Sequence, residues 1–319
     1  MKYAIIFVLL IIIETIYFKI ADKFNIIDKP NERSSHTGII IRGGGIIFTL
    51  GVLLYAVFFK LPYPWFIGGL ALISTISFID DTRELSSKVR IIIHFIAMSM
   101  MLYQLELNNY PLWHGILALI ICTGIINAYN FMDGINGITG GYSTITVLTL
   151  WFINYMFFPF TDGHLLLVLF MALMVFNFFN FRIKAKCFAG DVGSISMAFI
   201  LIFLVGQLII QTQNPAFIIL FGLYGVDSIL TIIHRLLLKE NIFKPHRKHA
   251  YQLMSNELKI PHVGTSSIYM LIQGILNAGF LYTWKFYPAC QFYYFFISLG
   301  ILALTYILFM KKYFYLHVR

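Results

Sequence analysis

Four polar residues follow one another at three-residue spacing in the middle of a strongly apolar chain. They are Asn127, Asn130, Asp133 and Asn136. On a helix this spacing drifts only slowly around one face, although the glycines after Asp133 favour a break in the helix there. Polar groups in an apolar segment cost too much to serve as packing residues. We therefore expect this set to bind a polar ligand. The amides can bond to a base or sugar, and Asp133 can take a metal or a ribose hydroxyl.

Carboxylates occur at the ends of two other apolar runs. Asp80 and Asp81 follow the run 65–79, and adjacent carboxylates repel each other unless a divalent cation or a shared proton neutralises them. Asp191 lies between Gly190 and Gly193, just before another apolar run. An Asp held between glycines suits a hard cation, and it equally suits the N-cap of the helix that follows. These acids predict an oxygen-rich site of the kind that Mg²⁺ prefers.

Two basic loops carry the residue types that bind anions. Their candidate binding residues are Lys29, His36 and Arg42 in the first loop, and His246, Arg247 and His249 in the second. Arg and His can form charge-assisted hydrogen bonds to a diphosphate, and the glycines at 43–45 open a helix whose N-terminus favours anions. The first loop could instead be an ordinary basic loop of a membrane protein. The histidines could instead hold a transition metal. Because the carboxylates elsewhere in the chain suit Mg²⁺ better, we favour phosphate as the ligand of the histidines.

Asp227 is an acidic residue inside an apolar run. It lies seven residues before His234, which is two helical turns. An intramembrane Asp is a functional candidate by default. Its expected partner is His234 or Arg235, and a buried structural ion pair is an equally good interpretation.

The elements that position these residues are membrane-spanning helices. The chain is 59% hydrophobic and 12% charged, which excludes an ordinary soluble domain. Its apolar runs have the length of membrane crossings, so we predict an all-α, polytopic membrane protein with a single catalytic domain over residues 1–319. The eleven predicted spans are 3–20, 44–60, 65–79, 91–107, 112–128, 139–158, 163–180, 193–211, 215–237, 265–283 and 292–310.

Positive charge divides the loops between two faces. All but three of the 23 lysines and arginines lie in one set of loops or at its helix ends; the exceptions are Lys2, Lys60 and Lys285. The positive-inside rule puts that set in the cytoplasm, with the N-terminus outside and the C-terminus inside. Every motif described above then lies on the cytoplasmic face. Topology also accounts for the net charge of +9, so no nucleic-acid partner is expected.

Taken in order, these motifs resemble those of the polyprenyl-phosphate N-acetylhexosamine-1-phosphate transferases. The matching motifs are Asp28-Lys-Pro with His36 and the Gly43–Gly45 triplet, Asp80-Asp81, Asn127-x-x-Asn130-x-x-Asp133-Gly-x-Asn136-Gly, Gly190-Asp191-x-Gly-Ser and His246-Arg-x-His249. The His-Arg-x-His form and the eleven spans are more similar to the branch that initiates O-antigen or common antigen. Lys248 and the segment 250–252 differ from the triple-histidine run of the peptidoglycan translocase, which argues against a UDP-muramoyl-pentapeptide substrate.

The resemblance implies a Mg²⁺-dependent reaction, with Mn²⁺ as a substitute, at the bacterial inner membrane. Undecaprenyl phosphate would attack the β-phosphate of a UDP-N-acetylhexosamine and release UMP, starting a cell-surface polysaccharide. By similarity, Asp191 would be the main metal ligand, with Asp81 assisting, and Asp80 would be the candidate base. The set Asn127, Asn130, Asp133 and Asn136 would orient the nucleotide-sugar, and His246, Arg247 and His249 would bind its diphosphate or sugar. A homodimer is left open.

Two other functions compete with this one. A transporter or flippase for lipid-linked sugars would place its ionisable residues near the bilayer midplane, and Asp227 is the one good candidate there. An enzyme similar to the peptidoglycan translocase is the other alternative. The sequence does not name the sugar.

Overall fold

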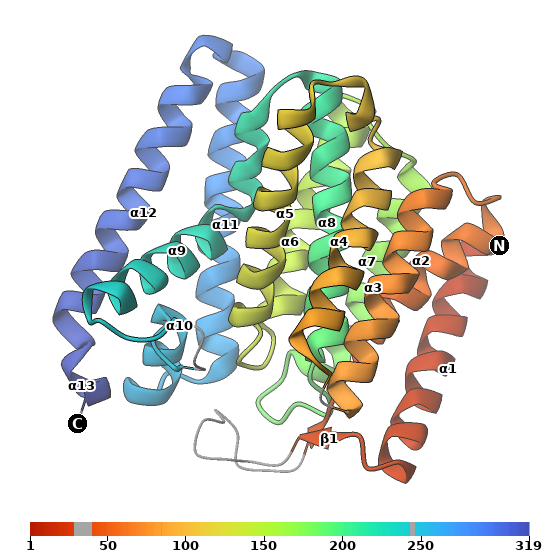
Figure 1. Ribbon diagram of the computed structural model, residues 1–319, viewed down its shortest axis with the longest axis horizontal. Helices are drawn as coiled ribbons and strands as arrows, with labels where there is room; N and C mark the ends of the chain where they lie inside the picture. Colours follow the sequence, from red (N-terminus) through yellow and green to blue (C-terminus); the bar gives the residue numbers. More distant parts are fainter. Residues whose placement is uncertain (29–39, 84, 243–245, 319) are drawn as a thin grey trace.

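The computed structural model describes residues 1–28, 40–83, 85–242 and 246–318, and nearly all of them are helical (Figure 1). The prediction of an all-α, multi-pass membrane protein is confirmed. The longer helices are α1 (Lys2–Lys23), α2 (Ile46–Phe58), α3 (Pro64–Thr82), α4 (Ser87–Gln104), α5 (Leu112–Met132), α6 (Ile138–Phe152), α7 (Gly163–Asn180), α8 (Gly190–Thr212), α9 (Gly222–Leu237), α11 (His262–Phe286) and α12 (Gln291–Tyr313). The shorter elements are β1 (Ile27–Asp28), β2 (Ile40–Ile41), η1 (Leu107–Asn109), η2 (Ile153–Phe157), η3 (Pro215–Phe221), α10 (Ala250–Gln252), η4 (Leu253–Glu257), η5 (Pro288–Cys290) and α13 (Tyr315–Val318).

Each apolar run that the sequence predicted to cross the membrane coincides with a helix. Six of these segments are long and apolar enough to cross by themselves: Lys2–Lys23, Leu112–Met132, Gly163–Asn180, Gly190–Thr212, Pro215–Leu237 and Pro288–Tyr313. α2 is apolar but has only 13 residues. The count of eleven crossings and the sides on which the termini lie stay predictions.

The predicted span 215–237 changes its helix type part-way. Residues Pro215–Phe221 form the 3₁₀-helix η3, and α9 starts at Gly222. The side chain of Asn214 caps η3 by accepting a hydrogen bond from the backbone N–H of Ala216 at 3.1 Å. Figure 1 shows α9 leaving the bundle obliquely toward α12. This direction carries Asp227, on α9, to the end of the molecule where the polar loops lie.

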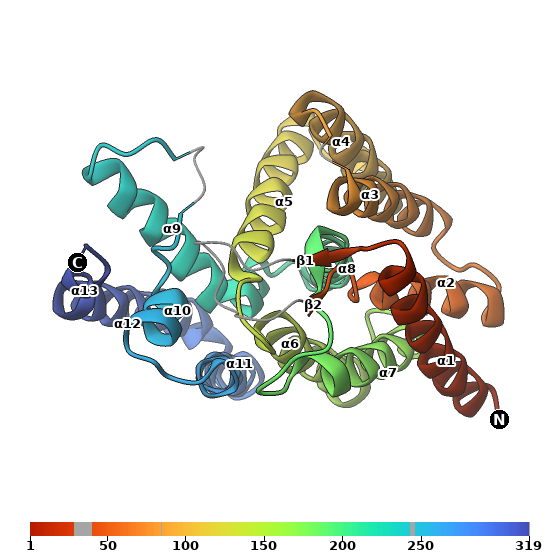
Figure 2. The same ribbon diagram turned by 90° about the horizontal axis from the view of Figure 1, so that it is seen from below.

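Helix α8 is the centre of the bundle. It packs against α2, α3 and α5, and the end-on view in Figure 2 shows it surrounded by other helices. Its sequence is apolar on all sides, which is typical of a fully buried helix, and it is the most deeply buried of the six candidate spans. α12, by contrast, has very few buried residues and lies on the outside of the bundle (Figure 2). The position of α8 therefore fixes Asp191 in its first turn.

The starts of α2 and α8 meet without intervening side chains. The backbone N–H groups of Gly44 and Gly45 donate to the carbonyls of Phe188 and Ala189 at 2.8 and 3.1 Å. A Cβ on Gly45 would come within 2.3 Å of Gly193 Cα. Two helix N-termini, each with a partial positive charge, are thus brought together at one end of the bundle.

Replacing Gly45 with alanine is expected to destabilise the protein by about 1–3 kcal/mol, because backbone atoms of α8 would have to move. The loss should appear as a lower midpoint of thermal unfolding in detergent. Gly124→Ala is the matched control, since no described atom lies within 4 Å of a Cβ at that position of α5. Equal midpoints for the two variants would contradict this account of the helix contact.

The loops that the sequence assigned to one face do converge. β1 and β2 pair as an antiparallel hairpin, with Ile27 opposite Ile41, and Ile41 also bridges to Cys187 in the loop before α8. These segments and the turns after α3 and α5 lie together at the lower end in Figure 1. The described parts of these motif-bearing segments therefore lie at one end of the bundle, and the membrane side that this end faces stays a prediction.

Candidate active site

Asp81 joins α3 to the N-terminus of α8. Its carboxylate accepts hydrogen bonds from the backbone N–H groups of Asp191 and Val192 at 3.0 and 2.9 Å, and α8 has no side-chain cap of its own from Ala189. Arg42 Nε lies 2.9 Å from the same carboxylate. Asp81, whose side chain is fully buried, therefore serves as the distant cap of α8 and as the partner of Arg42.

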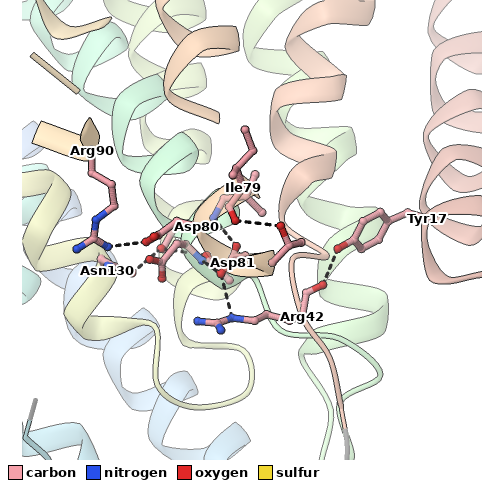
Figure 3. A network of polar contacts seen from close by, with 12 residues as sticks. Tyr17, Arg42, Ile79, Asp80, Asp81, Arg90 and Asn130 are labelled. Atoms are coloured by element: carbon pink, nitrogen blue, oxygen red, sulfur yellow. Dashed lines mark hydrogen bonds and ion pairs between the residues drawn. The ribbon is translucent and has the colours of Figure 1, made fainter. Parts of the chain in front are cut away.

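Asp80 has different partners from its neighbour. Its two oxygens accept from the backbone N–H of Leu85 at 3.0 Å and from Arg90 at 2.5 Å. Figure 3 shows Arg90 and Arg42 reaching Asp80 and Asp81 separately, from different sides. To contact a substrate as the predicted base, Asp80 would have to exchange its bond with Arg90, a residue that the sequence reasoning did not single out.

Asp191 differs from Asp80 and Asp81 in the bonding of its carboxylate. Its backbone is bound by Asp81, but no hydrogen bond to its side chain occurs among residues 1–28, 40–83, 85–242 and 246–318. The alternative role as N-cap of α8 does not apply, because Asp191 lies inside the first turn of the helix. Glycine at 190 is required, since its φ is +71° and a Cβ would lie 2.7 Å from an oxygen of Asp81.

Asn130 and Asp133 lie beside the start of α8, which carries Asp191. Ser194 Oγ of α8 is 3.0 Å from Asn130 Oδ1. Asp133 accepts a hydrogen bond from Thr139 Oγ1 at 2.6 Å. The pKa of Asp133 is raised to about 7, mainly by burial; the hydrogen bond from Thr139 opposes this shift and the charge of Asp191 contributes to it. Asp133 and Asp191 are therefore close enough to repel each other, as two carboxylates in a cation or phosphate site do.

The four-residue polar set does not share one helical face. α5 ends at Met132, so the three-residue spacing stops being helical before Asn136. The Asn136 side chain donates to the carbonyls of Arg182 and Ile183 at 3.0 and 3.1 Å, which ties the turn after α5 to the loop before α8. Asn127 is exposed on α5. Of the set, Asn130 bonds to Ser194 in the first turns of α8, and Asp133 lies near enough to Asp191 for their charges to interact.

Asn180 is a buried residue of the site that the sequence reasoning did not assign. Its side-chain oxygen accepts from the Gly137 N–H at 2.8 Å, and its side-chain nitrogen donates to the Cys187 carbonyl at 2.8 Å. It thus bridges the turn after α5 and the loop that leads to Asp191. Its signal in the sequence was weak, because a single Asn at the end of an apolar run usually marks a helix terminus.

The second basic loop folds over the end of α5. His246 and His249 stack with ring centroids 5.0 Å apart, and Phe131 of α5 lies 6.3 Å from each ring. Burial lowers the pKa of His246 to about 3, with neighbouring His249 adding to the shift. His246 is therefore a neutral imidazole at physiological pH, which leaves Arg247 as the permanent cation of this motif.

Asp227 pairs with a different residue from the ones predicted. His249 Nδ1 lies 3.1 Å from Asp227 Oδ1. His234 instead packs on Phe314, with ring centroids 4.5 Å apart, and Arg235 binds Glu240 and the carbonyls of residues 241 and 242. The predicted partnership with His234 or Arg235 is wrong, because two helical turns separate the side chains by about 10 Å along the axis.

Lys29 and His36, predicted to bind substrate, lie outside the described residues. Arg42 is described and partly exposed, and it contacts Asp81.

Comparison with known proteins finds a similar family. The profile of glycosyl transferase family 4 matches residues 63–209. Over this region the chain is similar to that family. A probable undecaprenyl-phosphate N-acetylglucosaminyl 1-phosphate transferase of Bacillus subtilis is 28% identical over 273 residues, covering 76% of this chain and 73% of the relative. The undecaprenyl-phosphate alpha-N-acetylglucosaminyl 1-phosphate transferases of Yersinia pestis and Escherichia coli K12 are each 27% identical, covering 74% of this chain and 71% of the relative.

The region that matches the family profile contains all the acids of this site. It includes Asp80, Asp81, Asn130, Asp133 and Asp191. Arg42 and the His246–His249 loop lie outside residues 63–209, and the structure brings them to the same end of the bundle. The protein thus builds one polar site from the matched region and from segments on both sides of it.

The chemistry available to the protein follows from these charges. Several carboxylates lie next to Arg42 and Arg90 at the end of an apolar bundle. Such a set can hold phosphate groups and a divalent cation while an apolar substrate stays in the bilayer. No cluster of three His, Cys, Asp or Glu side chains ready to bind a metal occurs in the described ranges.

Proposed function

We propose that this protein transfers N-acetylhexosamine 1-phosphate from a UDP-sugar to undecaprenyl phosphate. An oxygen of the lipid phosphate forms a bond to the β-phosphorus, the bond between the β-phosphorus and the bridging oxygen breaks, and UMP leaves. The observation that carries this proposal is the acid cluster of Asp81, Asp133 and Asp191 beside Arg42, at the end of a membrane bundle. The relatives are named for transfer of N-acetylglucosaminyl 1-phosphate, so UDP-GlcNAc is the first donor to test.

The site also suggests which residues do what. Asp191 would be the main Mg²⁺ ligand because its carboxylate accepts no described hydrogen bond. Asp81 would hold α8, and with it Asp191, in place. When bound, Mg²⁺ would neutralise charge on the phosphates and so favour attack. Arg42 and Arg90, each partly exposed, would turn from the carboxylates to the two incoming phosphates. Asn130 and Asp133 would orient the nucleotide-sugar.

The topology completes the proposal. With the basic loops in the cytoplasm, the site opens where UDP-sugars are made, and the protein lies in the bacterial inner membrane with its N-terminus outside and its C-terminus inside. A transporter is less well supported. Its expected midplane acid, Asp227, bonds to His249 of the same end loop as the other motifs, so the ionisable groups gather at one end.

Transfer can be tested with purified protein, undecaprenyl phosphate, Mg²⁺ and UDP-GlcNAc labelled in the sugar. We expect label in the organic extract and an equal amount of UMP. EDTA should abolish the reaction, and added Mg²⁺ should restore it. Mn²⁺ should partly substitute for Mg²⁺, because the acids are hard oxygen ligands.

A panel of UDP-amino-sugars identifies the donor in the same assay. No labelled lipid with any of them would overturn the proposal. Movement of a preformed lipid-linked sugar across proteoliposomes would then favour the transporter.

A further inference from the structure

Asp227 is buried among hydrogen-bond donors. It is 2% exposed. Its Oδ1 accepts from the Ala250 N–H at 3.2 Å and from Thr231 Oγ1 at 3.1 Å, and its Oδ2 accepts from the Tyr269 hydroxyl at 2.6 Å. A carboxyl group surrounded in this way acts only as an acceptor. The fourth contact, to His249 Nδ1 at 3.1 Å, must therefore also be a donated hydrogen bond.

This contact fixes the tautomer of His249. Nδ1 also faces the backbone N–H of Gln252 at the start of α10, but a nitrogen that donates to a carboxylate cannot accept from an amide, and the charged partner is the stronger one. With the Nδ1 proton directed at Asp227, Nε2 is the nitrogen left for another partner. It is buried and has none among the described residues, although buried polar atoms are normally paired.

The ring of His249 is held in orientation as well as in tautomer. It stacks between His246 and Tyr251, with centroids 5.0 and 5.7 Å away. The Tyr251 hydroxyl donates to the Phe131 carbonyl at 2.9 Å, and a Cβ on Gly134 would collide with that hydroxyl at 2.1 Å. His249 is thus fastened to the turn that carries Asp133, at the edge of the acid cluster.

We propose that Asp227 is a positioning residue, which holds His249 so that Nε2 binds a phosphoryl oxygen of the donor diphosphate. The inference rests on the proposed function and adds a residue outside the predicted motifs. A carboxylate behind the imidazole lets the ring carry its second proton without leaving an isolated buried charge. Nε2–H then donates to the anionic ligand. Asp227 itself touches no substrate.

A double-mutant cycle tests whether Asp227 acts through His249. The parameters kcat and KM for UDP-GlcNAc are measured for the wild type, Asp227→Asn, His249→Gln and the double variant. An Asn at 227 can present its NH₂ to Nδ1 and reverse the tautomer, so Asp227→Asn should lower kcat/KM by roughly 10–100-fold, as loss of an outer partner typically does. The double variant should be no worse than His249→Gln by more than about twofold.

The controls separate positioning from simple loss of stability. Asp162→Asn removes another partly buried helix-capping carboxylate, one that accepts from Tyr55 and His164, and it should leave kcat/KM unchanged. Tyr269→Phe keeps the charge of Asp227 and removes one donor. It should lower kcat/KM a few-fold in the wild-type background and not in His249→Gln.

Two results would overturn the inference: Asp227→Asn within about twofold of the wild type, or losses that multiply in the double variant. If either result is obtained while the wild type is active, only the role of Asp227 is rejected and the proposed function stands. An inactive wild type would instead reject the function.

Discussion

Changing Asp191 to asparagine is expected to slow sugar-phosphate transfer by roughly 10³-fold or more. Neutralising phosphate charge with a bound metal contributes several kcal/mol to the transition state, and about 4 kcal/mol corresponds to about 10³-fold in rate. Asparagine has nearly the same shape as aspartate, and no described residue bonds to the Asp191 carboxylate, so the fold should persist. Turnover by the radiolabel assay and Mn²⁺ binding by electron paramagnetic resonance measure the two effects.

Asp22→Asn is the control for this experiment, because Asp22 is an exposed acid at the C-terminal end of α1. It should retain full activity and metal binding. If Asp191→Asn kept more than a tenth of the wild-type rate, or bound Mn²⁺ as tightly as the wild type, Asp191 would not be the principal ligand.

Asp81→Ala should cost both folding stability and activity, whereas Asp80→Ala should cost mainly activity. Removing Asp81 leaves two N–H groups of α8 uncapped and deprives Arg42 of its partner. We expect a loss of about 3 kcal/mol, at the lower end for a broken buried ion pair because Arg42 stays partly in solvent. Among the described residues, Asp80 bonds only to Leu85 and Arg90, so its removal disturbs one local turn.

The two alanine variants are compared by thermal unfolding in detergent alongside the transfer assay. Asp81→Asn keeps a carbonyl acceptor for one N–H and should recover part of the stability but none of the charge. The contacts indicate that Asp81 stabilises the fold and that Asp80 serves mainly activity. Equal unfolding midpoints for Asp80→Ala and Asp81→Ala would contradict this difference between the two acids.

The helices could be predicted because their signal is local. A run such as 193–211 is apolar at every position, and only a helix satisfies its backbone in a membrane. The change from a 3₁₀-helix to an α-helix at Gly222 has no such signal in the sequence, since the residues on both sides of it are apolar. The common face of the motif loops was predictable for a related reason, as lysine and arginine mark that face along the whole chain.

The detailed contacts of the site depend on residues far apart in the sequence. Spacing predicted His234 as the partner of Asp227, yet the partner is His249, which comes from a separate loop. Spacing also placed Asn136 with Asn127, and the end of α5 separated them. Asp80 and Asp81 look equivalent in the sequence, and only the position of α8 distinguishes them. These outcomes are set by tertiary packing, for which one sequence gives no direct signal.

The cap that Asp81 provides for α8 has a consequence for biosynthesis. The two amides that it accepts lie 110 and 111 residues later in the chain, so they leave the ribosome long after α3. Arg42 is made before Asp81 and can neutralise it during that interval. A nascent chain that stops short of Asp191 has neither of the two capped amides nor the Asp191 carboxylate, and it cannot assemble the acid cluster. Incomplete products inserted in the membrane are therefore unable to consume the lipid phosphate on which the finished protein would act.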